Sequence, residues 1–191
     1  MQQLEVINIL KKDLNFTDQS IEKLKEFTKL VLKENKNHNL ISKSTENHIW
    51  LRHVLDSAQL VKFIDFSCNS LADLGSGAGF PGLVVEIFNK NKAFHVKLFE
   101  KSPVKRQFLL RVIKELGLNA EVLGDVRDEK LDQIIQVSRE IAQKPHKLMI
   151  LKGQNAQEEI KNSFKTKKYP YKLVSSMTNK DSKIILMEIN K

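Results

Sequence analysis

The fold of this chain is decided by one stretch, Leu71-Ala72-Asp73-Leu74-Gly75-Ser76-Gly77-Ala78-Gly79-Phe80-Pro81-Gly82. An apolar run ends at an acidic residue, four glycines follow within eight positions, and the helix-forming residues 83–88 come directly after. Glycine permits positive φ and lacks the Cβ that would keep a ligand from the backbone, and free N–H groups at a helix start favour polar or anionic ligand atoms. The stretch therefore predicts a strand, a turn and a helix that bind a nucleotide-like cofactor.

Two cofactors are compatible with this turn. Residues 77–82 satisfy G-x-G-x-x-G, the dinucleotide fingerprint. The spacing from Asp73 to Gly79 also matches D-x-G-x-G-x-G, the nucleoside-binding loop of class I S-adenosylmethionine methyltransferases. Glu100 ends the next apolar run and would accept hydrogen bonds from ribose hydroxyls in either class. The turn alone leaves NAD, S-adenosylmethionine and a turn that binds nothing as open alternatives.

The composition favours a single-domain protein of the cytoplasm with a polyanionic partner. The 191 residues carry a net charge of +9, and nucleic acid is the obvious partner for such a balance. Lysines that alternate with glutamates on solvated helix faces would give the same net charge, so charge alone does not decide whether the protein binds nucleic acid. The single cysteine, Cys68, excludes an internal disulfide framework. We expect no signal peptide and no membrane span, because the chain shows neither pattern.

The pattern of apolar residues changes along the chain. Residues 1–66 have helical spacing and predict an N-terminal helical cap, whereas residues 67–191 predict the cofactor-binding body as one compact unit. In that body, apolar runs (71–74, 96–99, 121–123 and 148–151) alternate with helical segments (83–89, 103–116 and 131–143). This alternation predicts an α/β fold with a parallel, doubly wound sheet.

The end of the chain differs from the rest of the body. Two extended runs, 171–177 and 184–189, have no helix between them and should pair as an antiparallel hairpin. A dehydrogenase would instead need further βα units for the nicotinamide half of its cofactor. A terminal hairpin on one sheet is typical of Rossmann-like class I methyltransferases, and it favours S-adenosylmethionine.

Five motifs recur in order along nearly the whole chain: Asn39-Leu40-Ile41-Ser42, Arg52-His53-Val54-Leu55-Asp56-Ser57, the stretch 73–82, Glu100-Lys101-Ser102 with Lys105-Arg106 and Phe108-Leu109, and Leu151-Lys152-Gly153. Together they resemble the bacterial 16S rRNA guanine-N7 methyltransferases, also called the glucose-inhibited division protein B family. The resemblance implies an S-adenosylmethionine-dependent enzyme that methylates guanine N7 in 16S rRNA, acting on the rRNA or the small ribosomal subunit, and we expect a monomer.

The resemblance also implies a site. The cofactor-binding residues would be Asp73, Gly75, Ser76, Gly77, Gly79, Phe80, Glu100, Val126, Arg127 and Asp128. In the Val126–Asp128 segment the match is loose, and the arginine stands one position away from its place in the family pattern. The rRNA contacts would be Arg52, His53, Lys105, Arg106 and Lys152. Guanine N7 has a lone pair and no proton, so the reaction needs positioning and no general base, and the five histidines show no metal-ligand spacing.

One departure from the family is large. After the third strand the family continues through an apolar strand into Ser-Arg-Ala, whereas here Asp128 passes directly into Glu129 and a helical segment. A parallel crossover needs about a dozen or more connecting residues, so a strand with its flanking loop is absent between these two residues. We expect those residues to belong to the native protein. The alternatives are a methyltransferase with a small-molecule or protein substrate, and a non-catalytic RNA-binding remnant.

Overall fold

The computed structural model describes residues 3–68, 70–124, 131–152, 160–161, 169–179 and 181–190. They belong to two compact units, Met1–Arg127 and Asp128–Lys191, and each unit is described by itself below. The boundary between these units lies between residues 127 and 128. The division into a helical cap and a catalytic body stays a prediction.

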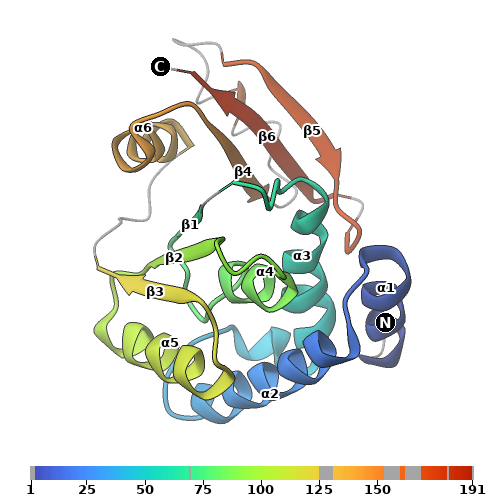
Figure 1. The fold of residues 1–191 in the computed structure, drawn as a ribbon. Coiled ribbons are helices and arrows are strands. Elements are labelled where there is room, and N and C mark those ends of the chain that lie inside the picture. The colour runs from blue at the N-terminus through green and yellow to red at the C-terminus, as the bar shows by residue number, and fades with distance from the viewer. Residues whose placement is uncertain are drawn as a thin grey trace. The chain divides into compact units, whose positions relative to one another are not determined.

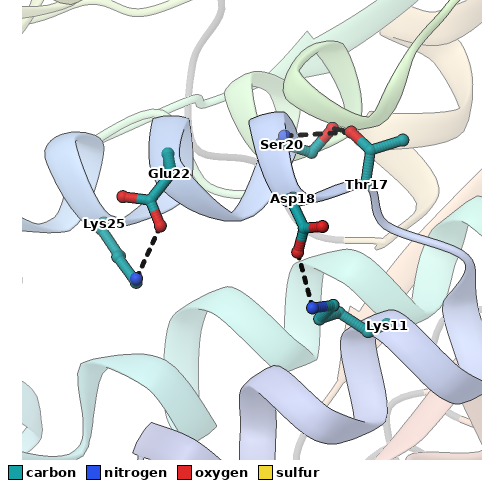
Figure 2. A network of polar contacts seen from close by, with 6 residues as sticks. All are labelled: Lys11, Thr17, Asp18, Ser20, Glu22 and Lys25. Atoms are coloured by element: carbon teal, nitrogen blue, oxygen red, sulfur yellow. Dashed lines mark hydrogen bonds and ion pairs between the residues drawn. The ribbon is translucent and has the colours of Figure 1, made fainter.

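The first unit begins with helices, as the sequence predicts. They are α1 (Gln3–Leu14), α2 (Asp18–Asn35), η1 (Lys43–His48), η2 (Trp50–Leu55), α3 (Asp56–Ala58) and η3 (Gln59–Lys62), of which η2 is a π-helix. Figure 2 shows how α2 starts: the Thr17 hydroxyl accepts a hydrogen bond from Ser20 N–H at 3.1 Å, and Asp18 pairs with Lys11 of α1 at 2.6 Å. No helix among the described residues is long and apolar enough to cross a membrane.

A parallel sheet follows in the same unit. Its elements are β1 (Ser70–Leu74), α4 (Gly82–Phe88), β2 (His95–Phe99), α5 (Pro103–Leu116) and β3 (Ala120–Leu123). Figure 1 shows β2 between β1 and β3, and both pairings are parallel. The alternation predicted from the sequence is therefore confirmed over this region, with element ends that agree within one or two residues.

The helices and the sheet of the first unit share one apolar core. Phe27 of α2 and Val54 of η2 are fully buried in the same cluster as Val96 and Leu98 of β2. α2 contacts both α4 and α5. The buried hydroxyl of Ser20 donates to the carbonyl of Ile87 in α4 at 2.9 Å. The N-terminal helices thus fix the position of the helix that follows the glycine-rich turn.

The second unit has its own sheet and core. It contains α6 (Leu131–Ala142), β4 (His146–Lys152), β5 (Tyr171–Ser175) and β6 (Lys183–Ile189), with the strand order β4-β6-β5. Both pairings are antiparallel, which confirms the predicted terminal hairpin of β5 and β6. Ile135 of α6 packs in one apolar cluster with Leu148, Ile185 and Met187 of the sheet.

The expected single sheet is therefore present as two three-stranded sheets. Among the described residues β1 pairs with β2 alone, and β4 pairs with β6 alone. In a doubly wound fold the strand after β3 returns to pair with the free edge of β1, giving the order 3-2-1-4. Seven residues, 124–130, separate β3 from α6. They are too few for a crossover of about a dozen residues and a further strand, and the described residues hold no strand beside the free edge of β1.

Candidate active site

The glycine-rich turn joins β1 to α4, as predicted. Three of its glycines have positive φ, at 79° for Gly75, 57° for Gly77 and 97° for Gly79, and side chains rarely tolerate this conformation. The N–H groups of Gly75 and Ser76 both donate to the carbonyl of Phe99 at 2.9 Å. The turn is therefore attached to the carboxyl end of β2, the edge of a parallel sheet where ligands bind.

Two buried carboxylates hold the turn in place. Asp73 accepts from Gly82 N–H at 3.0 Å, and Glu100 accepts from Gly77 N–H at 2.8 Å and from Ser102 N–H at 2.7 Å. Burial raises the pKa of Asp73 from its ordinary value to about 6; the hydrogen bond from Gly82 opposes the rise and the negative charge of Glu100 adds to it. Each of these carboxylate oxygens has a further lone pair that can accept a hydrogen bond.

Glycine is required at the positions of the turn for different reasons. A Cβ at Gly82 would lie 2.6 Å from Asp73 Oδ2 and closer still to Leu98, and a Cβ at Gly79 would lie 2.6 Å from Leu83. These two positions need glycine because neighbouring protein atoms fill the space. At Gly77 the nearest atom to such a Cβ is the carbonyl oxygen of Gly75, at 3.9 Å. The space beside the Gly77 Cα is thus open, and its backbone has a conformation that side chains rarely tolerate. Both features suit a position where a nucleoside approaches the backbone closely.

Phe80, at the end of the turn, lies between two rings from the N-terminal helices. The ring centroid of Phe27 is 4.9 Å away, and that of His53 is 5.1 Å away. His53 belongs to the π-helix η2, a type of helix often found at functional sites. The structure therefore brings the Arg52-His53 motif to the glycine-rich turn, two features that the sequence places about 25 residues apart.

A hydroxyl fixes the ring of His53. Its Nε2 lies 2.9 Å from Thr45 Oγ1. Burial lowers the pKa of His53, the Arg52 charge adds to this effect and Asp56 opposes it, so the imidazole is neutral at neutral pH. A neutral ring packs against Phe80 without the cost of burying a charge.

Sequence reasoning missed Asn35, Thr45 and Phe27 as residues that support the site. Asn35 Oδ1 accepts from Leu40 N–H at 2.7 Å and from Ile41 N–H at 2.9 Å. It thereby holds the Asn39–Ser42 motif, which leads into the turn that carries Thr45. The only available signal was a polar residue at the end of an amphipathic helix, which does not distinguish a buried amide from a solvated one.

The remaining predicted residues lie in different places. Arg52 is exposed, and Arg106 donates to the carbonyls of Glu100 at 3.0 Å and Lys101 at 2.7 Å. Lys105 is half-buried at the start of α5, where Ser102 caps the helix, and Lys152 is the last residue of β4 in the second unit. The segment of Val126, Arg127 and Asp128 lies outside the described residues, as does Gly153. The described residues hold no cluster of three metal-ligating side chains.

Known proteins resemble this chain over almost all of its length. Residues 20–185 match the family model described as rRNA small subunit methyltransferase G. Three relatives carry the name ribosomal RNA small subunit methyltransferase G. The protein of Pelagibacter ubique is 30% identical (95% of this chain, 93% of the relative), that of Orientia tsutsugamushi strain Ikeda 33% (97% and 98%) and that of Rickettsia akari 34% (86% and 92%).

The alignments also carry an internal difference. The alignment with the Pelagibacter protein is 201 positions long. It covers 95% of this 191-residue chain, which is about 181 residues. About 20 positions of the relative therefore have no counterpart here, and the same comparison with the Rickettsia akari protein leaves about 12. These numbers are the size of a strand with its loop, which is what the sequence pattern leads us to expect between Asp128 and Glu129.

The family assignment rests on agreement between these findings. The family model covers most of the chain, the relatives are at least 30% identical over nearly their full lengths, and the α/β fold with its glycine-rich turn is the one expected of a Rossmann-like class I methyltransferase. The chain belongs to the rRNA small subunit methyltransferase G family.

Proposed function

We propose that this protein transfers a methyl group from S-adenosylmethionine to N7 of a guanine in 16S rRNA. The observation that carries the proposal is the turn from Asp73 to Gly82, held by two buried carboxylates and packed through Phe80 against His53, in a chain of this family. Because the proposed substrate is a component of the ribosome, the proposal includes a cytoplasmic location. We expect the protein to act as a monomer.

The residues around the turn suit a nucleoside with an attached amino acid. Gly75, Gly77 and Gly79 let the ligand approach the backbone, and Glu100 would accept from the ribose hydroxyls. The cofactor supplies an electrophilic methyl group on a sulfonium centre. By the resemblance, the segment of Val126, Arg127 and Asp128 would lie beside the adenine.

The chemistry proposed for this site needs no proton transfer. Guanine N7 presents a lone pair, so the protein contributes alignment of the two reactants and exclusion of water. His53 suits a positioning role, because its ring is neutral and already bonded to Thr45. Arg52 is exposed on the same π-helix and can grip a guanine or a phosphate with two donors. Lys105, Arg106 and Lys152 complete the proposed rRNA-facing set.

Methylation of 16S rRNA with a labelled methyl donor, followed by borohydride–aniline mapping, tests the proposal. We expect label at N7 of a guanine and a rate that changes little between mildly acidic and neutral pH, since no essential base titrates there. Arg52→Ala and Lys152→Ala should lose methylation while they keep the affinity for S-adenosylhomocysteine. Gly77→Val should lose that affinity. Label on an exocyclic amine or a ribose hydroxyl, or a limb near pH 6.5 in the rate profile, would contradict the mechanism.

The absent strand favours a second candidate function, an RNA-binding protein that has lost catalysis. Calorimetric titration with S-adenosylhomocysteine separates the two. Binding with turnover on rRNA supports the enzyme, whereas rRNA binding without any affinity for the cofactor product supports the remnant. A third candidate, a methyltransferase with another substrate, would show turnover in the absence of rRNA.

A further inference from the structure

A second surface of the first unit has the character of a binding groove. It encloses about 520 Å³ and lies where the start of α1, the length of α2 and the start of η2 come together. It is lined by Lys25, Lys29 and Lys33 of α2, by Lys36, which directly follows that helix, and by Trp50. The other lining residues are uncharged, while Glu22 and Glu26 pair with two of the lysines.

The helix explains why the lysines line one groove. They recur at intervals of four, four and three residues, the spacing that places side chains on one face of a helix. At 1.5 Å per residue, the eleven steps from Lys25 to Lys36 correspond to about 16 Å along the axis. The opposite face of α2 carries Leu24, Phe27 and Val31, which are fully buried in the core. The lysines thus form an extended strip, in which Glu22 and Glu26 pair with the first two and the last two carry charge that is unpaired among the described residues.

Part of this charge is available to a ligand. Figure 2 shows Lys25 paired with Glu22 at 2.7 Å, and Lys29 lies 3.6 Å from Glu26. Both ion pairs are exposed, and exposed ion pairs contribute little to stability. A ligand can therefore replace the glutamates at small cost in free energy. Lys33 and Lys36 are exposed, and neither has an ion pair to any residue in the described part of the chain.

Trp50 provides an independent observation. Its side chain is 92% buried, with 8% exposed, and its indole N–H has no hydrogen-bond acceptor among the described residues. No buried side-chain nitrogen or oxygen in those residues lacks a partner, so this N–H is reached by solvent. An indole N–H only donates, as does an ammonium group. The exposed ammonium groups of Lys33 and Lys36 and the indole N–H of Trp50 are therefore donors at this surface that have no partner among the described residues, and they suit a ligand rich in acceptors.

We propose that this groove binds the phosphodiester backbone of single-stranded rRNA that flanks the methylated guanine. The inference rests on the proposed function and extends the rRNA contact beyond the glycine-rich turn. Phosphate oxygens accept hydrogen bonds and carry the opposite charge, and a strip of about 16 Å suits an extended polyanion better than a single phosphate. The π-helix η2 carries both Trp50, which lines the groove, and Arg52 of the proposed active site.

Replacing two lysines by glutamine tests the groove. Lys33→Gln/Lys36→Gln removes two charges and keeps helix propensity, because glutamine and lysine are equivalent in helices. The matched control, Lys90→Gln/Lys92→Gln, removes two exposed charges from the loop between α4 and β2. We expect the salt dependence of binding to a 16S rRNA fragment, plotted as log K against log salt, to become less steep by about 1.4 in the groove variant, at about 0.7 per lost phosphate contact. The control should change it by less than half of that.

Trp50→Phe keeps most of the ring and removes the N–H, and it should weaken binding to the fragment without a change in affinity for S-adenosylhomocysteine. An unchanged salt slope in the groove variant, an equal change in the control, or polyglutamate that competes as well as RNA would overturn the proposal. Its failure is distinct from failure of the proposed function. If the wild-type protein methylates 16S rRNA but the groove variant has an unchanged salt slope, the groove proposal alone is refuted. If the salt slope is steep and depends on the groove lysines but no methylation occurs, the proposed enzymatic function alone is refuted.

Discussion

The carboxyl group of Asp73 should make the stability of the first unit fall as pH rises. Its side chain is buried at the end of β1, and burial raises its pKa from 3.8 to about 6. The folded protein therefore binds this proton more tightly than the unfolded chain does. The stabilisation is fully present below about pH 4 and is lost as pH rises through 6. A shift of about two units, at about 1.4 kcal/mol per unit, corresponds to about 3 kcal/mol.

Asp73→Asn isolates this effect. The amide oxygen still accepts from Gly82 N–H, but the side chain no longer ionises. The free energy of unfolding of the wild type minus that of the variant should therefore fall by about 3 kcal/mol between pH 4 and pH 7. Every group that titrates alike in both proteins cancels in this difference. Asp13→Asn is the matched control, because it removes an exposed carboxylate from α1.

Urea titrations at several pH values give the required free energies. The chain has one tryptophan, Trp50, which lies in the first unit, so its fluorescence reports the unfolding of that unit. A difference between wild type and Asp73→Asn that stays constant from pH 4 to pH 7, or that grows with pH, would refute the account of Asp73 as a buried group with a raised pKa.

Three further results are expected. Gly82→Ala should lower the free energy of unfolding by about 1–3 kcal/mol, because its Cβ overlaps neighbouring side chains, whereas Gly124→Ala, with its nearest atom at 3.9 Å, should be neutral in the same urea titration. Thr45→Val should slow rRNA methylation by about fivefold, as expected for one hydrogen bond of about 1 kcal/mol to His53, and Thr45→Ser should restore it; equal rates in both variants would contradict this role. Mass spectrometry of the protein from its native source should give about 2 kDa more than 22.0 kDa if the segment before α6 is present there, and 22.0 kDa would instead support the remnant.

The local part of the site was predictable from sequence. Glycine spacing after an apolar run predicts a turn with positive φ, and Gly75, Gly77 and Gly79 have that conformation. Apolar periodicity likewise predicts β1, β2, β3 and the terminal hairpin, because burial on one or both faces of a sheet leaves a pattern in the sequence. These features depend on residues that are close together along the chain.

The contacts that complete the site were not predictable, because they join distant residues. Nothing in the sequence around Phe80 identifies Phe27 as its neighbour, and a hydroxyl such as that of Thr45 is common on solvated turns. Asn35 falls in a polar stretch that is typical of a loop, yet its side chain is buried and accepts two backbone N–H groups. Polar residues of this kind are recognised only when the partners that satisfy them are known.

The absent strand affects the two halves of the proposed site differently. The cofactor turn is held by β1 and β2 through Asp73, Phe99 and Glu100, all of which belong to the first unit. Lys152, on the proposed rRNA side, belongs to the second unit. The contacts that shape the turn do not require the absent strand. In a doubly wound sheet, however, the absent strand would lie between β1 and the strand that carries Lys152.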